Sequence, residues 1–404
     1  MKPLEFEIQK QPSTVRAVRF HAASSRFKSL VEGRKLFVIQ EDLDHRLTKE
    51  RLERIASIKI PSRADADNWE WKETPANLVK SYSAGDFLIK DESQNPTGTI
   101  KARMAWEYVK WYAVWAKATL DSLARGETAG GAENAKIPRL SIITAGNAGA
   151  ALAHYFEKYG LPRPHLLVSN KIGKAQLDLL KGMHCNIYMA DLDLRMLKPK
   201  DILEFTNNAE SGIDATSATI LRRNEVYYDW FSYEVFNSAV ENGARKIYLP
   251  GGSFETLGNL VFHLTNISAR HWKGEKQDVR LKVDAKEALQ LQLVAVTTNG
   301  RYISKLGAKF IFAVYDGNDF HAAALAGLPG GSIRIASIPN DWLEWGHRIV
   351  SGEAKINAEP AACAGMALVA YERNREILAP DEKVFVISTG KGIGGGCYAA
   401  KIRQ

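Results

Sequence analysis

The stretch Asp91-Glu92-Ser93-Gln94-Asn95-Pro96-Thr97-Gly98-Thr99-Ile100-Lys101 decides how this chain folds. It follows a short apolar segment, 87–89, that predicts a β-strand, and it precedes a pattern that predicts a long helix over 102–123. Asn95-Pro96-Thr97-Gly98 predicts a tight turn, because proline fixes φ and glycine adopts conformations that other residues avoid. Lys101 is therefore expected at a strand–turn–helix junction, where the backbone fixes its position.

Lys101 is the candidate catalytic residue of this stretch. Free lysine has a pKa of about 10.4, so it is protonated and a poor nucleophile at neutral pH. Burial or a neighbouring positive charge lowers that pKa and permits Schiff-base formation with a carbonyl. The other interpretation is a solvated side chain, one among the 54 lysine and arginine residues of the chain.

The length and composition limit the class of protein. The chain has 404 residues, of which 45% are hydrophobic, and this predicts two or three domains with sizeable cores. It has no run of 18 apolar residues and no apolar N-terminal segment, so neither a membrane span nor a signal peptide is expected. We therefore expect a cytoplasmic protein.

The cysteines and the charge argue against further classes. Cys185, Cys363 and Cys397 form no CxxC pair and no cluster with histidine, so disulfides and a metal site are not expected. The formal net charge is +8, but lysine and arginine are dispersed without a basic block, so nucleic acid is not an expected partner. A mildly basic protein instead attracts anionic small molecules.

Residues 104–205 predict a small α/β domain. The long helix that begins at 102 carries tryptophan and tyrosine side chains, which are expected to pack rather than to bind a ligand. After it, apolar strands alternate with helices, and this alternation predicts parallel strands joined by right-handed crossovers. The strands are expected at 140–143, 165–168 and 185–189, and the helices at 150–159 and 174–181.

Residues 1–103 and 206–404 are expected to form a larger domain. Residues 1–70 carry weak patterns, and we interpret them as an N-terminal extension packed on this domain. Strands are expected at 36–39, 246–249, 291–296 and 384–387, and helices at 227–242 and within the ranges 44–60 and 354–373.

Three more turns follow predicted strands, and each contains glycine and hydroxyl residues. They are Thr144-Ala145-Gly146-Asn147-Ala148-Gly149, Pro250-Gly251-Gly252-Ser253-Phe254-Glu255-Thr256-Leu257 and Ser388-Thr389-Gly390-Lys391-Gly392. A glycine turn before a helix presents backbone N–H groups and a helix N-terminus to an anion. Residues 390–395 also fit G-x-G-x-x-G, but the residues up to Gln404 leave no room for the helix and acidic strand of a dinucleotide site, which is therefore not expected.

The stretch from Asn95 to Arg103 resembles a known family motif. It is similar to the cofactor-lysine motif N-P-T-G-S-F-K-D-R of the fold-type II (tryptophan synthase β-like) enzymes that use pyridoxal 5′-phosphate (PLP), and it is closest to threonine synthase. Ile100 and Ala102 depart from that motif. Together with the three turns and Glu359-Pro360-Ala361, the resemblance covers roughly residues 70–397.

The resemblance implies a fold and a site. The implied fold is α/β, with two three-layer domains, mostly parallel sheets and PLP in the cleft between them, where open parallel sheets bind ligands. Lys101 would hold PLP as a Schiff base and later remove the α-proton of the substrate. The implied cofactor-binding residues are Lys101, Asn147, Gly252, Ser253, Phe254, Glu255, Thr256 and Thr389, and the implied substrate-binding residues are Thr97, Thr144, Ala145 and Gly146.

Two residues of the implied phosphate loop depart from the family, which has glycine at both positions. Phe254 restricts the backbone, and Glu255 brings a negative charge near a phosphate dianion. Either both side chains point away or phosphate binding is weakened. Thr389 would place a neutral hydroxyl at the pyridine nitrogen, which favours elimination at Cβ over deeper carbanion chemistry.

The implied function is a PLP-dependent lyase or synthase of amino acid metabolism. It would carry out elimination or replacement at the β- or γ-position of an amino acid, which could be phosphorylated or acylated, and a homodimer is expected. Two alternatives stay open. One is a serine or threonine dehydratase or a racemase, and the other is a relative that has lost catalysis and acts as a binding protein.

Overall fold

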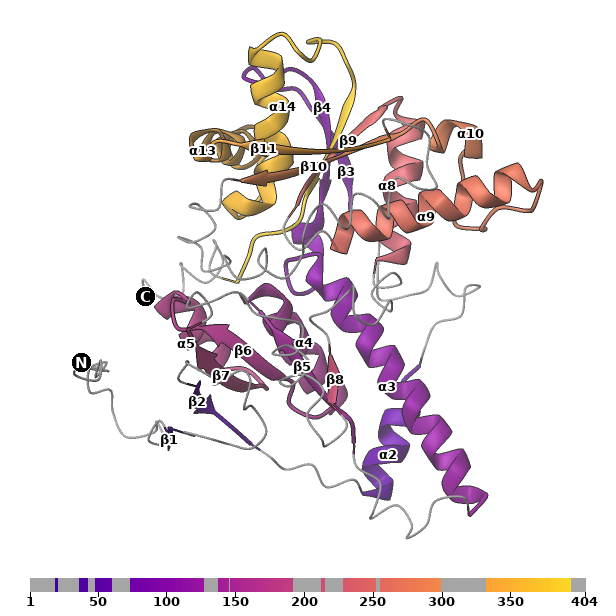
Figure 1. Ribbon diagram of the computed structural model, residues 1–404, viewed down its shortest axis with the longest axis vertical. Coiled ribbons are helices and arrows are strands. Elements are labelled where there is room, and N and C mark those ends of the chain that lie inside the picture. Colours follow the sequence, from indigo (N-terminus) through magenta and orange to yellow (C-terminus); the bar gives the residue numbers. More distant parts are fainter. Residues whose placement is uncertain are drawn as a thin grey trace.

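The computed structural model describes residues 19–20, 36–42, 48–59, 73–126, 137–144, 146–191, 212–214, 228–251, 255–298 and 332–393. These residues form two β-sheets, one above the other in Figure 1, with helices around both. The long helix α3 (Lys101–Ala124) starts where the two parts meet and runs alongside the lower sheet. Its first residue is the lysine that the sequence singles out.

The smaller, lower sheet has the strand order β1-β2-β7-β6-β5-β8. The four strands β7, β6, β5 and β8 are parallel, whereas β2 is antiparallel to β7 and β1 to β2. The strands are β1 (Arg19–Phe20), β2 (Leu36–Gln40), β5 (Arg139–Ile143), β6 (His165–Ser169), β7 (Asn186–Ala190) and β8 (Gly212–Asp214). The helices of this part are α2 (Lys49–Ala56), α3, α4 (Asn147–Tyr159) and α5 (Lys174–Lys181).

The larger, upper sheet has the order β11-β10-β9-β12-β4-β3, and all its strands are parallel except β3. The strands are β3 (Ala76–Val79), β4 (Phe87–Asp91), β9 (Lys246–Pro250), β10 (Gln292–Thr298), β11 (Ile333–Ile338) and β12 (Val384–Ser388). The helices are α8 (Asp229–Glu241), α9 (Glu255–Trp272), α10 (Ala285–Ala288), α13 (Asn340–Arg348) and α14 (Ala364–Asn374). Short turns of other helix types lie at η3 (Glu92–Gln94), η6 (Ile349–Glu353) and η7 (Pro360–Cys363).

Helices cover both faces of the larger sheet. Phe87 and Ile89 of β4 join the hydrophobic cluster that contains α14, whereas Leu88 joins the cluster that contains α8 and α9. All five residues of β4 are buried, as are all five of β12. Strands buried on both faces lose the apolar–polar alternation, which explains why they read as continuous apolar runs in the sequence. The expected α/β architecture with mostly parallel sheets is confirmed.

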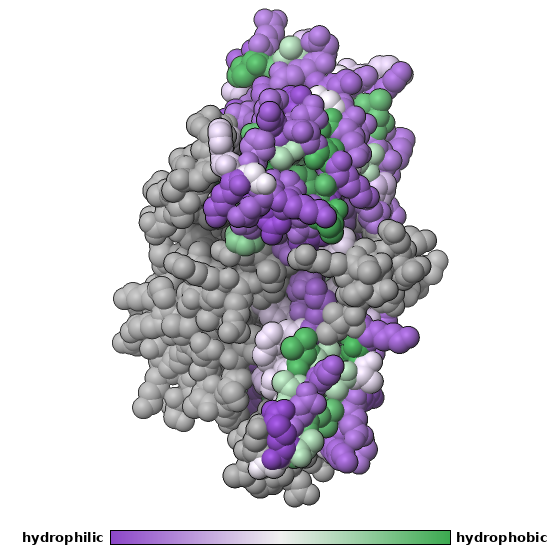
Figure 2. Space-filling model, turned by 90° about the vertical axis from the view of Figure 1, so that its right-hand side faces the viewer, coloured by the Kyte–Doolittle hydropathy of each residue, from purple (hydrophilic) through white to green (hydrophobic). Residues whose placement is uncertain are grey.

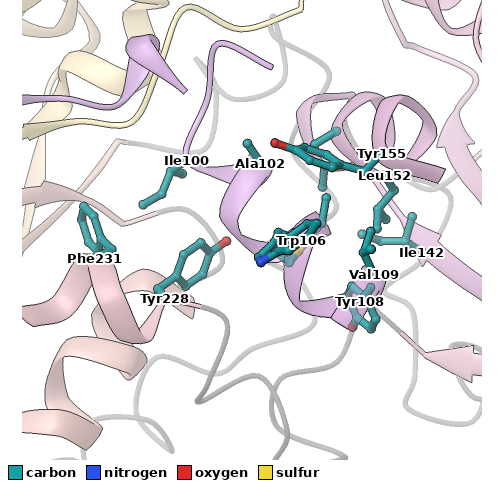
Figure 3. Close-up of a cluster of buried hydrophobic side chains, with 14 of the residues drawn as sticks. Ile100, Ala102, Trp106, Tyr108, Val109, Ile142, Leu152, Tyr155, Tyr228 and Phe231 are labelled. Atoms are coloured by element: carbon teal, nitrogen blue, oxygen red, sulfur yellow. The ribbon is translucent and has the colours of Figure 1, made fainter. Parts of the chain in front are cut away.

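The aromatic side chains of α3 form the core between α3 and its neighbours. The ring centroid of Tyr112 lies 5.4 Å from that of Phe156 on α4, and the Trp106 ring lies 5.4 Å from Tyr159. In Figure 3, Tyr228 and Phe231 approach the first turns of α3 from one side, and residues of the smaller sheet and α4 pack on the other. The prediction that these aromatic residues pack is therefore confirmed.

Residues 36–40 correct one prediction. β2 pairs with β7 at the edge of the smaller sheet, with Phe37 opposite Met189, so this part of residues 1–70 does not pack on the larger domain. The pairing is fixed by a side chain, because Nε2 of Gln40 donates to the carbonyl oxygen of Cys185 at 2.8 Å. A short apolar strand in a sequence does not specify which sheet edge it joins. β8 extends the smaller sheet past residue 205, and the remaining domain boundaries stay a prediction.

The helix expected within 354–373, with its start at Glu359-Pro360, opens with a 3₁₀ turn. Glu359 has extended backbone angles (φ −75°, ψ 152°), and the α-helix proper starts at Ala364 after the 3₁₀ turn Pro360–Cys363. The cause is Pro360, because a residue before proline is pushed out of the helical region. The other predicted strands and helices for which residues are described are present, with ends displaced by a few positions.

The described residues on one face of the molecule are mostly polar at the surface. On the face seen in Figure 2, hydrophilic residues cover most of the described surface around the larger sheet, with smaller hydrophobic groups between them. No helix in the described segments is long and apolar enough to cross a membrane.

Candidate active site

Backbone hydrogen bonds join the lysine turn to the end of β12. The Ile100 N–H donates to the Thr389 carbonyl at 2.9 Å, and the Lys391 N–H donates to the Gly98 carbonyl at 2.9 Å. Gly390 has φ +135°, and a Cβ there would lie 2.5 Å from the Gly98 oxygen. Only glycine tolerates this approach, so two motifs that are nearly 300 residues apart in the sequence form one unit.

The Lys101 amine lies in a polar contact that the sequence did not predict. Its Nζ donates to Oε2 of Glu255 at 2.6 Å and to the Tyr228 hydroxyl at 3.0 Å, and the Lys101 side chain is 22% exposed. Burial acts to lower the pKa of Lys101, but the Glu255 carboxylate and then Tyr228 outweigh it and raise that pKa above its ordinary value. The expectation of a lowered pKa is therefore wrong for this arrangement.

A network of buried charges lies beside Lys101. Arg103 donates to both carboxylate oxygens of Glu92 (2.8 and 3.1 Å) and to both of Glu234 (2.9 and 2.8 Å). Nζ of Lys90, fully buried, lies 2.8 Å from Glu234. Burial acts to raise the pKa of Glu234, but Arg103 and Lys90 outweigh it and lower that pKa. Arg103 of the family-like motif therefore fixes the start of α3 through its bonds to the two carboxylates.

The loop before α4 is closed by its own side chains. The Thr144 hydroxyl accepts the N–H groups of Gly146 (3.0 Å) and Gly149 (3.3 Å). Gly146 has φ +139°, and a Cβ there would lie 2.6 Å from Cδ1 of Ile393. Thr144 and Gly146 therefore lie at the N-terminal end of α4, where the Ile393 side chain packs against Gly146.

The Asn147 amide connects the smaller part of the molecule to the larger. Its Nδ2 donates to Oε1 of Glu359 at 2.8 Å, and its Oδ1 accepts the Ile393 N–H at 2.9 Å. Burial raises the pKa of Glu359 to about 7, although the Asn147 hydrogen bond acts to lower it. Asn147 is predicted to bind the cofactor, and its Nδ2 has a second N–H beside the one that it donates to Glu359.

Two hydroxyl groups of the turns are buried without a partner. Oγ1 of Thr97 and Oγ of Ser388 have no hydrogen-bond partner among the described residues. Ser388 ends β12 immediately before Thr389, which is partly exposed. A buried polar group without a partner costs free energy, and a bound polar molecule would supply the missing hydrogen bonds. An amine, several hydroxyls and a helix start gathered in this way fit PLP.

The phosphate loop is described only in part. Gly252, Ser253 and Phe254 lie outside the described residues, as does Ala145 in the other loop. Glu255 and Thr256 are the first two residues of α9. The Glu255 side chain is only 8% exposed and points to Lys101 rather than to solvent. Sequence reasoning named Glu255 for its charge but missed its partner Tyr228, for which the sequence carries no signal beyond its place before a helix.

A cavity elsewhere in the molecule does not coincide with this site. It has a volume of about 270 Å³ and is lined by Asp341, Trp342, Trp345 and Arg348, all on α13. None of these residues belongs to the predicted set, and α13 lies apart from the start of α3 in Figure 1. Among the described residues, no group of three His, Cys, Asp or Glu side chains could hold a metal ion.

One segment of the chain matches a known family model. Residues 71–268 match the family model described as "Pyridoxal-phosphate dependent enzyme". These residues form a domain of the pyridoxal-phosphate dependent enzyme family. The matched range contains Lys101, Asn147 and Glu255, and the cofactor of the family is PLP. No curated protein sequence matches the chain.

Solved structures show the same fold over most of the chain. A PLP-dependent aspartate racemase has a TM-score of 0.53 at 14% identity and covers 87% of this chain and 98% of its own. A hydrogen sulfide-producing enzyme from Fusobacterium nucleatum has a TM-score of 0.54 at 15% identity, and the match covers 86% of this chain and 99% of that enzyme. The apo form of Escherichia coli diaminopropionate ammonia lyase has a TM-score of 0.54 at 14% identity, and the match covers 86% of this chain and 89% of that enzyme. At these identities the similarity establishes the fold and leaves the reaction open.

Proposed function

We propose that this PLP-dependent enzyme eliminates or replaces a group at the β- or γ-carbon of an amino acid, as a threonine synthase-like lyase or synthase. The observation that carries the proposal is the Lys101 amine at the head of α3, beside Tyr228 and Glu255. PLP, when bound, stabilises negative charge at the α-carbon of an amino acid. Lys101 would hold the cofactor and then act as the base at that carbon.

The arrangement of proton-carrying groups favours elimination over racemisation. A racemase that uses two groups needs them on opposite faces of the α-carbon, so that one removes the proton and the other returns it. Here Tyr228 and Glu255 both contact the same atom, Nζ of Lys101, within 3.0 Å. The described residues therefore supply proton transfer at one point, which suits removal of the α-proton followed by loss of a leaving group.

The hydroxyls at the end of β12 support the same reaction class. Ser388 and Thr389 follow one another there, and both are neutral. A neutral partner leaves the pyridine nitrogen unprotonated, which moderates the electron sink and favours elimination. The substrate would be an amino acid, with a phosphorylated or acylated hydroxyl as one possibility for the leaving group. A homodimer and a cytoplasmic location stay predictions.

The test begins with the absorbance spectrum of the purified protein after addition of PLP, before and after borohydride. We expect a visible band that reduction fixes on Lys101, as mapped by mass spectrometry. The K101A variant should lose the band and all turnover, whereas K110A, which removes a lysine paired with Glu107 on the same helix, should keep both. Retained turnover in K101A would refute the assignment.

Product analysis then separates the reaction classes. Serine, threonine, phosphoserine and phosphohomoserine are offered in turn, with and without a thiol nucleophile. Keto acids indicate elimination, and new thioether amino acids indicate replacement. Inverted substrate without either product would favour the racemase, and a protein that PLP does not colour would favour the binding-protein alternative.

A further inference from the structure

Glu255 stands where the family has glycine, and its carboxylate contacts the lysine that would carry the cofactor. We propose that Glu255 is a catalytic acid–base residue that exchanges a proton with Nζ of Lys101, while Tyr228 holds that amine in position. This inference rests on the proposed function, since it assigns a role at the same lysine. It also explains why a glutamate, and not glycine, stands at position 255.

The contact geometry supports proton exchange rather than a simple surface ion pair. The Nζ to Oε2 distance of 2.6 Å is at the short end for a charge-assisted hydrogen bond. The two side chains are only 22% and 8% exposed, so water competes little for the contact. Tyr228 is almost fully buried, and its hydroxyl takes a second N–H of the amine at 3.0 Å. The amine is thus oriented toward one carboxylate oxygen.

The other charged groups near the amine are committed elsewhere. Glu92 of η3 is paired with Arg103, which also binds Glu234, and burial raises the pKa of Tyr228 to about 12. A hydroxyl with that pKa stays protonated and cannot accept a proton from an ammonium group at neutral pH. The groups that face the amine or its turn are Glu255 from α9, Tyr228 before α8, Glu92 from η3, Arg103 from α3 and Lys391, whose side-chain carbons cover Gly98.

Bond formation at Lys101 needs such a proton acceptor. As an ammonium group, Lys101 has no lone pair and cannot attack an aldehyde carbon. Glu255 takes one proton, the nitrogen forms its bond to carbon, and Glu255 returns that proton to the aldehyde oxygen. The oxygen takes a second proton from the nitrogen and leaves as water, so the protonated C=N bond and one water are the products. No proton is gained or lost overall, and Glu255 ends in its starting state.

The experiment compares the wild type with E255Q, E255D and the control E107Q, all prepared without cofactor. Glu107 pairs with Lys110 on the same helix at 2.7 Å, so E107Q removes a similar ion pair away from the site. The first readout is acetylation of individual lysines by acetic anhydride between pH 6 and 11, mapped by mass spectrometry. The second is the rate at which added PLP becomes fixable by borohydride on Lys101.

The two readouts are expected to move in opposite directions. E255Q should acetylate Lys101 at least tenfold faster at pH 8, because the amine loses the charge that keeps it protonated. The same variant should form the C=N bond to PLP at least tenfold more slowly, because glutamine cannot return a proton to the aldehyde oxygen, which acetylation does not require. E255D keeps a carboxylate and should recover part of the rate, and E107Q should change the labelling of Lys110 alone.

Other outcomes overturn the proposal. Unchanged acetylation of Lys101 in E255Q would mean that the pair does not form in solution. Faster bond formation in E255Q would make Glu255 an obstacle and not a catalyst. If E255Q does not fold, as judged by circular dichroism, E255A serves the same test, and wild-type bonding rates in E255A would refute the role. A wild type that never forms a fixable bond at Lys101 overturns the proposed function itself, whereas the acetylation profile still reports on the pair.

Discussion

Replacing Arg103 by methionine should destabilise the protein by about 3–5 kcal/mol, because it removes one partner of a buried charge network. Arg103 makes four hydrogen bonds of 2.8–3.1 Å to the carboxylates of Glu92 and Glu234. Glu92 is fully buried, and the change would remove the guanidinium that contacts both of its carboxylate oxygens. Lys90 still contacts Glu234, so the loss falls mainly on Glu92.

The assay is urea unfolding followed by circular dichroism, with the midpoint compared at constant slope. The exposed Arg375 supplies the matched control, and R375M should change stability by less than about 0.5 kcal/mol. The loss in R103M should shrink as the pH falls. The lowered pKa of Glu234 means that its stabilising contribution is present above its ordinary value of 4.5 and is lost as the pH falls through the lower native pKa. A loss below about 1 kcal/mol at pH 7 would refute the reasoning.

Two further predictions concern residues around the site. Because burial raises the pKa of Glu359 to about 7, the stability of the cofactor-free protein should fall by up to about 3 kcal/mol as the pH rises from about 4.5 to 7, and thermal unfolding should show no such fall in E359Q. An identical pH profile in both proteins would contradict this. The G390A variant places a Cβ 2.5 Å from the Gly98 oxygen, so it should separate β12 from the lysine turn. We expect the free energy of unfolding to fall by about 1–3 kcal/mol and PLP binding, measured by absorbance titration, to be lost. Wild-type affinity for PLP would show that the close approach is dispensable.

The sequence was most informative where burial is complete. Strands β4 and β12 are apolar throughout because both of their faces are covered, and their positions could be predicted within a residue or two. Helix α3 could be predicted from its length and from the turn before it. The pairing of β2 with β7 could not be predicted, because any sheet edge offers the same backbone groups to a short strand.

The sequence predicted which segments form the site, but not the side-chain contacts made at Lys101. Lys101, Thr97, Thr389 and Asn147 belong to segments that backbone bonds or side-chain contacts bring together, and Lys101 lies where the motif implies. The contacts that set its protonation come from Tyr228 and Glu255, more than 120 residues away. Such contacts depend on the packing of α8 and α9 against α3, which no local pattern encodes. Burial alone would lower the pKa of Lys101, but the same packing places the Glu255 carboxylate beside its amine and raises that pKa.

The central position of β12 has a consequence for synthesis on the ribosome. β12 lies between β9 and β4, so the paired strands β3 and β4 cannot join the rest of the larger sheet until the chain has grown to residue 388. At about 5–20 residues per second, β4 waits roughly 15–60 s after its own synthesis. Strands β5, β6 and β7 have all emerged by residue 190 and can pair with one another during that interval. The lysine turn and its cofactor site are completed last, so a nascent chain depends on protection of the one edge of β4 and the one edge of β9 that β12 later covers.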